Sequence, residues 1–251
     1  MKKRAGILLL IFCILLTTVS HDPVSAREEK DRDYYETRGD IVWEVPTDSK
    51  VIALTFDDGP DSVYTPQIVE LLKQYHAKAT FFVVGSRVKA NPEVARLLAK
   101  EEHELANHTY THPDMRRISS KKLMDEVLKT QQTIYDTTGV RPQLFRPPGG
   151  YYSESVVNVA KQAGALVIMW SWHQDTRDWS DPGVNKIVNK VLRNARNGDI
   201  VLFHDYGGNR RQTVQALKQI LPELQRRGYQ FVTVSELMKG YGKIKKVGKG
   251  D

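Results

Sequence analysis

The chain has 251 residues, of which 40% are hydrophobic and 27% charged, and its formal net charge is +7. This length fits a single α/β barrel domain, because such barrels commonly contain about 250 residues. The only cysteine is Cys13, which excludes an intramolecular disulfide framework and a cluster of thiolate ligands, so a metal would have to be bound by His, Asp or Glu.

The N-terminal segment has the pattern of a secretory signal peptide. The basic residues Lys2 to Arg4 precede an apolar block from Ala5 to Val19, and Val24-Ser25-Ala26 is followed by charged residues. We expect a signal peptide over residues 1–26, cleaved after Ala26. An uncleaved membrane anchor is the alternative, but the block of 15 residues is shorter than the roughly 20 that a spanning helix needs.

The rest of the chain divides into three parts. Residues 27–47 are charged and poor in aliphatic side chains, and we expect a linker that becomes ordered near Ile41-Val42-Trp43. Residues 48–240 are expected to form one catalytic domain, and residues 241–251 a basic tail. Basic pairs are scattered and lack interleaved aromatic residues, so solvated helix faces and an anionic wall polymer explain them better than nucleic acid does.

Seven short apolar runs are typical of buried strands, and six longer amphipathic segments are typical of helices. The expected strands are Val51–Phe56, Ala79–Val84, Glu104–Asn107, Gln143–Phe145, Ala165–Trp172, Ile200–Phe203 and Phe231–Val234. The expected helices are Pro66–Tyr75, Pro92–Lys100, Lys121–Thr138, Glu154–Ala163, Val184–Asn197 and Arg211–Arg227.

The alternation of strands and helices predicts an α/β fold with parallel strands and right-handed crossovers, in either an open doubly wound sheet or a barrel. No Gly-x-Gly-x-x-Gly turn follows the first strand, which argues against a dinucleotide-binding sheet. About seven βα units favour a closed or nearly closed (β/α) barrel. Charged residues follow several expected strands, at the rim where barrel active sites are assembled, and we expect them to converge.

A candidate metal site combines two histidines and a carboxylate. His108 and His112 follow a short strand, and Pro113 favours a loop here. Two histidines at this spacing are a weak signal alone, but with Asp58 they leave coordination positions open, as catalytic zinc sites do; the same set suits iron-dependent oxygenases. Asp57 would serve a hydrolase as general base. The alternative for the Asp57-Asp58 pair is a turn that caps backbone amides.

Other rim residues are candidates for supporting roles. His204 ends an apolar run, and alone it would more often be a core histidine than a catalytic one. Arg146 begins a turn stiffened by two prolines and could pair with a buried aspartate or be solvated. Asp175 or Asp178 could orient His204. Nearby aromatic residues could wall an apolar pocket, stack on sugar rings or belong to the core: Tyr151, Tyr152, Trp170, Trp172 and Trp179.

Five segments match, in order, the five motifs of polysaccharide deacetylases. They are Thr55-Phe56-Asp57-Asp58-Gly59-Pro60, His108-Thr109-Tyr110-Thr111-His112, Arg146-Pro147-Pro148-Gly149, Asp175 to Trp179, and Leu202-Phe203-His204. The chain therefore resembles carbohydrate esterase family four, the NodB-homology enzymes, over about residues 50–238. Five ordered motifs are far more specific than any one of them. The resemblance implies a distorted (β/α) barrel with about seven parallel strands.

The resemblance also implies roles for the residues that carry chemistry. Asp58, His108 and His112 match the ligands of one divalent ion, usually zinc, with cobalt or nickel as possible substitutes. Asp57 matches the catalytic base, and His204 matches the general acid that protonates the departing amine.

Further matches concern residues around these groups. Arg146 matches the residue that tethers the base, and Asp178 matches the one that orients the acid. The backbone N–H of Gly149 matches a donor to the oxyanion. Leu202 and Trp179 match the pocket for the acetyl methyl group, and Tyr151 and Asp175 are expected beside the substrate.

Two positions bear on specificity. The family often has an aromatic residue where this chain has Gly149, so one side-chain wall of the groove is lost, and the neighbouring Tyr151 could fill the gap. Asp58 is a carboxylate, whereas the branch that acts on muramic residues in spore cortex typically has Asn there. N-acetylglucosamine units are therefore the expected target.

We expect a secreted, metal-dependent hydrolase, outside the cell or at the cell wall, that removes N-acetyl groups from N-acetylglucosamine units of peptidoglycan or of chitin-type oligomers. A monomer is expected, with a polysaccharide substrate, no nucleic-acid partner and no stable membrane insertion after signal cleavage. Acetylxylan O-deacetylation is an alternative, because ester and amide hydrolysis pass through similar tetrahedral intermediates. A non-catalytic cell-wall-binding module with a structural metal is an alternative of another class.

Overall fold

The computed structural model describes residues 30–241. The expected signal peptide over residues 1–26 lies outside the described residues, as does the expected basic tail beyond residue 241. Over residues 30–241, no helix combines the length and the apolar character that a membrane crossing requires.

The described residues contain one sheet of eight strands, in which every strand pair is parallel. Seven strands follow the order β1-β6-β5-β4-β3-β2-β7, and β8 pairs with the first residues of β2. This confirms the expected α/β fold, a distorted barrel with about seven parallel strands. The strands are β1 (Ile41–Val42), β2 (Val51–Asp57), β3 (Ala79–Val83), β4 (Glu104–Asn107), β5 (Leu144–Phe145), β6 (Leu166–Ile168), β7 (Ile200–His204) and β8 (Gln230–Phe231).

An irregular segment after β6 lies between the two edge strands, β1 and β7. The N–H of Ser171 donates to the carbonyl of Ile200 (3.0 Å), and Asp175 forms an isolated bridge with Leu202 of β7. The hydroxyl of Ser171 donates to the carbonyl of Trp43, just after β1 (3.4 Å). A loop with a few bonds to each edge thus replaces a paired strand, and this is why the barrel is distorted.

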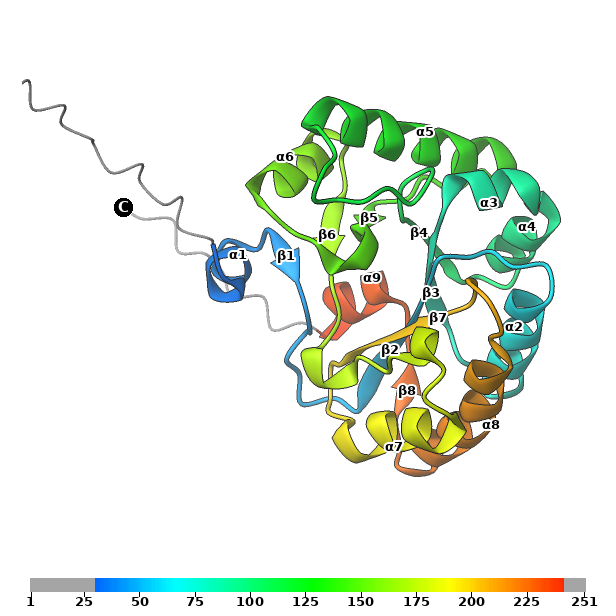
Figure 1. Ribbon diagram of the computed structural model, residues 1–251. Coiled ribbons are helices and arrows are strands. Elements are labelled where there is room, and N and C mark those ends of the chain that lie inside the picture. Colours follow the sequence, from blue (N-terminus) through cyan, green and yellow to red (C-terminus); the bar gives the residue numbers. More distant parts are fainter. Residues whose placement is uncertain (1–29, 242–251) are drawn as a thin grey trace, which may run out of the picture. The chain divides into compact units, whose positions relative to one another are not determined.

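Most helices lie around the outside of the strands (Figure 1). The six helices expected from the sequence are present, and their ends differ from the expected ends by at most three residues. The helices are α1 (Arg32–Arg38), α2 (Tyr64–Gln74), α3 (Gly85–Ala90), α4 (Pro92–Lys100), α5 (Ser120–Thr138), α6 (Glu154–Gln162), α7 (Val184–Asn194), α8 (Arg211–Arg226) and α9 (Val234–Glu236). Of these, α1, α3 and α9 were not expected.

The alternation of side chains along β2 separates two parts of the core. Phe56 faces the helices, where its ring stacks on Phe81 and Phe203 with centroid distances of 4.9 and 5.5 Å. Thr55 and Asp57 point to the opposite face of the sheet, toward the barrel interior. The carboxylate of Asp57, the last residue of β2, therefore lies on the interior side of the sheet.

Two expected strands end at least three residues earlier in the structure than predicted. The run Ala165–Trp172 is a strand only over Leu166–Ile168, because the carbonyls of Ile168 and Met169 accept hydrogen bonds from a buried arginine side chain. The run Phe231–Val234 ends as a strand at Phe231. There Thr233 and Glu236 form a reciprocal capping box, which begins α9 instead.

The described part of the expected linker over 27–47 belongs to the domain, which corrects that expectation. It contains α1 and β1, and β1 pairs with β6. The physical reason is aromatic burial. Tyr35 and Trp43 are 2% and 0% exposed, and both rings pack edge-to-face on Tyr152, which follows the turn after β5. These two buried rings, together with the pairing of β1 and β6, dock a segment that is otherwise rich in charged residues.

Candidate active site

Two adjacent carboxylates at the end of β2 both approach Nε2 of His108, at 3.9 Å for Asp57 and 3.5 Å for Asp58. Asp57 is the last residue of the strand and is 4% exposed. Asp58 has a φ of 78°, in the left-handed region that residues other than glycine rarely adopt. This turn removes Asp58 from the alternation of the strand, so its carboxylate faces His108 and His112 in the loop after β4.

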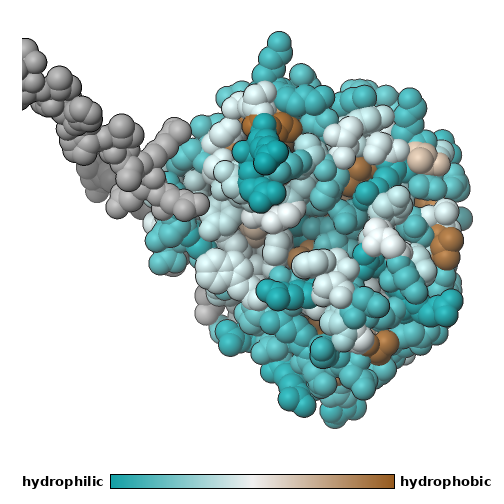
Figure 2. All heavy atoms as spheres, viewed as in Figure 1, coloured by the Kyte–Doolittle hydropathy of each residue, from teal (hydrophilic) through white to brown (hydrophobic). Residues whose placement is uncertain are grey.

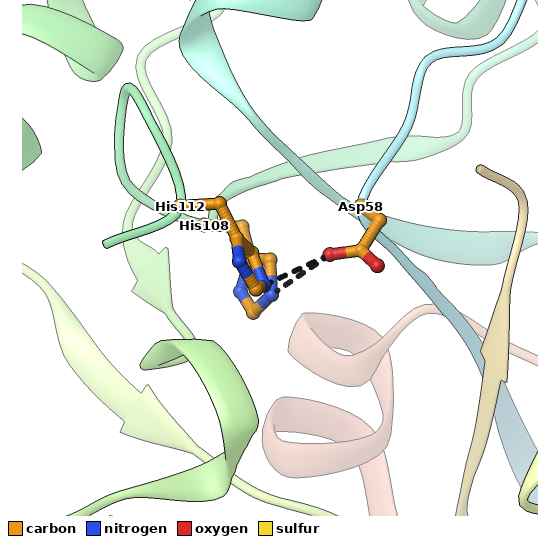
Figure 3. A group of neighbouring side chains, drawn as sticks. All are labelled: Asp58, His108 and His112. Atoms are coloured by element: carbon orange, nitrogen blue, oxygen red, sulfur yellow. Dashed lines mark ion pairs between the residues drawn. The ribbon is translucent and has the colours of Figure 1, made fainter. Parts of the chain in front are cut away.

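Asp58, His108 and His112 form a group that can bind a metal ion. Their ligand atoms all lie within 4.8 Å of one another. The Oδ1 atom of Asp58 lies 3.1 Å from Nε2 of His112 and 3.5 Å from Nε2 of His108, and Figure 3 shows both rings turned toward it. Two imidazole nitrogens and one carboxylate oxygen suit a divalent ion and leave other coordination positions free.

Two details of this group fit a cation. The buried Oδ1 atom of Asp58 has no hydrogen-bond partner among the described residues, although a buried carboxylate oxygen normally has one. Nδ1 of His108 lies 2.7 Å from the carbonyl of Arg146. Since a carbonyl only accepts, Nδ1 carries the hydrogen, so in the neutral ring Nε2, which faces Asp58, has a free lone pair, as in a metal-binding tautomer.

The pKa of Asp58 lies well below its usual range. Burial alone would raise this pKa, but the contacts with His108 and His112 outweigh burial and lower it. A carboxylate that stays ionised between two imidazoles is the protonation state that metal binding requires. The guanidinium of Arg87 also donates to the carbonyl of Asp58, which supports its unusual backbone conformation.

Arg146 holds Asp57 from inside the barrel. It follows β5, is fully buried, and donates from Nη1 to Oδ1 of Asp57 (2.6 Å) and to the hydroxyl of Thr55 (2.9 Å). The carbonyls of Ile168 and Met169 accept from its remaining nitrogens (3.1 and 2.7 Å). Burial lowers the pKa of Arg146, and the charge of Asp57 opposes that effect; an arginine remains protonated nonetheless. The fork of hydrogen bonds leaves Asp57 little freedom to rotate.

Asp178 holds the imidazole of His204, and His204 lies beside Asp57. Asp57 of β2 and His204 of β7 are paired in the sheet. Asp178 is 0% exposed, and its carboxylate lies 2.7 Å from Nδ1 of His204 and accepts from the backbone N–H of His204 (2.9 Å) and the hydroxyl of Thr213 (2.8 Å). Burial lowers the pKa of His204, but the hydrogen bond and charge of Asp178 outweigh it and raise the pKa to about 9. His204 is therefore a cation near neutral pH.

The expected substrate residues lie around this centre with different exposures. Gly149, with a φ of 64°, and Tyr151, 40% exposed, line a cavity of about 580 Å³ that also includes His112. An added Cβ at Gly149 would meet no atom within 4 Å, so the space that a side chain would occupy there is open. Leu202 is buried on β7 and Trp179 is 58% exposed beside Asp178.

In the described part of the chain, the carboxylate of Asp175 forms no hydrogen bond or ion pair with a catalytic candidate. Its carboxylate accepts from the backbone N–H of Arg177 (3.1 Å) and so shapes the turn that brings Asp178 to His204. Of the two aspartates that could orient His204, the structure therefore selects Asp178.

Sequence reasoning did not single out Thr55 or Asp205, which support the site. Thr55 alternates with Asp57 along β2, and this period of two is the signal that could have indicated it. Asp205 follows His204, is fully buried, and accepts from the hydroxyl of Thr65 (2.5 Å). Burial raises the pKa of Asp205 to about 7. No pattern in the sequence distinguishes such a buried aspartate from a solvated one.

The face of the domain in Figure 2 is mostly hydrophilic, and its apolar spots are small and separate. The large exposed side chains include Tyr151, Trp172 and Trp179. Isolated exposed aromatic rings on a polar surface are suited to stacking on sugar rings rather than to burying an apolar partner.

Comparison with known proteins agrees with this geometry. The family model of polysaccharide deacetylases matches residues 44–168. The chain is 51% identical, over 208 residues, to a peptidoglycan-N-acetylglucosamine deacetylase of Bacillus cereus, covering 83% of this chain and 97% of that protein. It is 39% identical, over 201 residues, to a chitooligosaccharide deacetylase of a Bradyrhizobium species, covering 75% of this chain and 91% of that protein.

A solved structure of a related protein has a similar fold. The crystal structure of the Bc1960 peptidoglycan N-acetylglucosamine deacetylase, in complex with 4-naphthalen-1-yl-N-oxidanyl-benzamide, superimposes with a TM-score of 0.79. The sequence identity is 32%, and the match covers 83% of this chain and 97% of that chain. The matches cover 75–83% of this chain and 91–97% of the three relatives.

Proposed function

Because the chain belongs to the polysaccharide deacetylase family, carbohydrate esterase family four with its NodB-homology domain, we propose that it hydrolyses the acetamide of N-acetylglucosamine units in peptidoglycan. The family assignment made from the five motifs is confirmed. The 51% identity to a peptidoglycan-N-acetylglucosamine deacetylase supports this substrate, and the chitooligosaccharide relative supports chitin-type oligomers as the next candidate.

One observation carries the reaction type. Asp57 and His204 are paired across β2 and β7, so two groups suited to moving protons lie side by side, next to Asp58 and the two histidines. A wall-binding module with a structural metal would need only the metal-binding group. The buried support of Asp57 by Arg146 and of His204 by Asp178 therefore favours an enzyme over a binding module.

Asp58, His108 and His112 would hold one divalent ion, and we propose zinc. The donor set, the unpartnered Oδ1 atom and the tautomer of His108 all fit it; cobalt or nickel would suit the same donors. When bound, such an ion supplies Lewis-acid polarisation of the acetyl carbonyl and a lower pKa of the attacking water.

Asp57 would act as the general base. One of its oxygens, Oδ1, is occupied by Arg146, which leaves Oδ2 to accept the proton of the attacking water. Oδ2 lies 3.9 Å from Nε2 of His108, so the accepting atom faces the group that would bind the metal. A base held in place by a buried fork needs no reorganisation when the water attacks.

His204 would act as the general acid. Its Nδ1 carries a hydrogen toward Asp178, and its raised pKa of about 9 keeps a second proton on Nε2 near neutral pH. That proton would be delivered to the amide nitrogen as the C–N bond breaks, so that the product leaves as an amine and acetate. Asp178 would stabilise the imidazolium that donates it, without itself transferring a proton.

The remaining site residues would bind the acetyl group and the sugar. The backbone N–H of Gly149 would donate to the oxyanion of the tetrahedral intermediate. Leu202 and Trp179 would surround the acetyl methyl group, and Tyr151, with Asp175 at the edge of the pocket, would contact the sugar. The open space at Gly149 gives the cavity room for a substituted sugar.

We propose that the protein is secreted and acts at the cell wall, as a monomer. Secretion and action at the cell wall are supported by the signal-peptide pattern of residues 1–26 and by the wall polymer named for the relative that is 51% identical.

The test is release of acetate from peptidoglycan, chitooligosaccharides and acetylated xylan, side by side, with chelator and with added zinc. Zinc-dependent release from peptidoglycan is expected, with slower release from chitooligosaccharides. Release from xylan alone would replace the proposal with the esterase alternative. Asp57→Asn should lower turnover by about 10²–10⁴-fold while zinc still binds, and full activity of that variant would refute the role of the base.

A further inference from the structure

A buried carboxylate outside the candidate site lies beneath the loop that carries the two histidines. Glu126 belongs to α5 and is 3% exposed. Its Oε2 atom accepts from the backbone N–H groups of Tyr110 (2.9 Å) and Thr111 (2.7 Å), and its Oε1 atom accepts from the hydroxyl of Thr111 (3.0 Å). Lys122, one turn earlier on the helix, lies 3.5 Å from Oε1. One side chain thus binds three donors of a single loop.

This loop has an unfavourable backbone conformation that needs support. Thr109 and His112 both have positive φ angles, 67° and 56°, although neither is a glycine. Such residues cost about 1 kcal/mol or more each and persist only where the surroundings hold them. The two N–H groups that Glu126 binds belong to the two residues between them, so Glu126 holds the centre of the strained turn.

The two histidines depend on the loop to different degrees. The ring of His108 is oriented by the carbonyl of Arg146 at Nδ1. No hydrogen bond to Nδ1 of His112 is formed by any residue over 30–241, and its ring is 37% exposed. Its backbone N–H has one partner, the hydroxyl of Thr109 (3.2 Å). Apart from the contact of its Nε2 with Asp58 and the neighbouring ring of His108, the His112 ring is therefore positioned by the backbone of the loop.

We propose that Glu126 is a positioning residue for the metal ligand His112, acting through the backbone of residues 109–112. By binding the N–H groups of Tyr110 and Thr111, it keeps the turn in the one conformation that directs Nε2 of His112 at Asp58. This inference rests on the proposed metal site. The proposed effect depends on the length of the Glu126 side chain and on the position of its acceptor oxygens. It does not depend mainly on charge, because Glu126 binds the loop and not a metal ligand side chain, and Lys122 partly balances its charge.

The experiment measures the affinity of the full chain for zinc by competition with a chromophoric chelator. Glu126→Ala should weaken zinc binding by about 10–100-fold, as loss of a group that orients a ligand typically does. Glu126→Gln should weaken it by less than about threefold, since one amide oxygen still accepts both N–H groups. Asp125→Asn is the matched control, because Asp125 is exposed, adjacent on the same helix and equal in charge; it should bind zinc as the unsubstituted chain does.

Glu126→Asp distinguishes the effect of side-chain length from the effect of charge. It also tests the proposal if the alanine variant does not fold. It retains the negative charge but is one methylene too short to reach both amides, so it should bind zinc at least about tenfold more weakly than Glu126→Gln. Equal affinity of these two variants, or an alanine variant that unfolds cooperatively yet binds zinc normally, would overturn the proposal. An unsubstituted chain that binds no zinc would instead refute the metal site itself.

Discussion

The contact between Asp178 and His204 should make the free energy of unfolding depend on pH. A substitution of His204 should remove this part of the pH dependence. His204 is nearly buried, with 14% of its side chain exposed, and its Nδ1 lies 2.7 Å from a fully buried carboxylate. The perturbation is His204→Gln, which removes the titrating group but keeps a polar side chain of similar size. Asp178→Asn is the companion variant, because it leaves the imidazole but removes its charged partner.

The magnitude follows from the raised pKa of His204. Its ordinary value of 6.5 increases to about 9 in the folded protein, which corresponds to about 3 kcal/mol at 1.36 kcal/mol per unit. Because the folded pKa is the higher one, this contribution is fully present below pH 6.5. As the pH rises from 6.5, the unfolded chain loses the proton first, and the contribution has disappeared above pH 9.

The assay is urea unfolding in the presence of a chelator, so that no metal contributes to stability. The difference in free energy of unfolding between the unsubstituted chain and His204→Gln should decrease by about 3 kcal/mol between pH 6 and pH 10. The same comparison on the Asp178→Asn background should show a much smaller decrease, since only the charges of Asp57 and Asp58 then oppose the effect of burial, which lowers the pKa of the imidazole. A difference that stays constant across this pH range in the Asp178-containing protein would refute the reasoning.

Three further outcomes can be checked by the same unfolding assay. Arg146→Lys should destabilise the fold by about 3–5 kcal/mol, because a lysine cannot replace the fork and leaves Asp57 buried without a full partner; an unchanged urea midpoint would contradict this. Gly59→Ala should cost about 1–3 kcal/mol, since its Cβ would lie 2.2 Å from a carboxylate oxygen of Asp205. A chain that begins at residue 48 should be less stable by more than about 3 kcal/mol than one that begins at residue 31, as the docked aromatic residues before it are lost. Equal stability would restore the linker interpretation.

Local patterns in the sequence were sufficient to predict most of the elements. Apolar runs of four to six residues located the long strands, and amphipathic periodicity located the six main helices within a few residues. The elements that were not predicted, β1, α1, α3 and α9, are short, with two to seven residues each. β1 has two residues and α9 three, too few for any periodicity, and both depend on contacts with distant parts of the chain, such as the pairing of β1 with β6.

Much of the candidate site was also predictable, because its residues occupy the ends of parallel strands. Asp57, Asp58, His108 and His204 could be identified by position and chemical type, and the structure brings them together as expected. Glu126 was missed, although it interrupts the buried face of an amphipathic helix. An acidic residue on an otherwise apolar helix face indicates that its carboxylate has a buried hydrogen-bond partner, but the sequence does not identify that partner.

The sequence by itself determined which segments are strands, which residues stand at their ends, and therefore what chemistry is present. Only the tertiary structure decided the partners. It placed β2 between β3 and β7, so that Asp57 lies beside His204, and it placed the carboxylate of Asp178 2.7 Å from the imidazole of that histidine. The physical reason is that secondary structure follows from neighbours along the chain, whereas a hydrogen bond between residues far apart in sequence depends on the register and packing of the whole barrel.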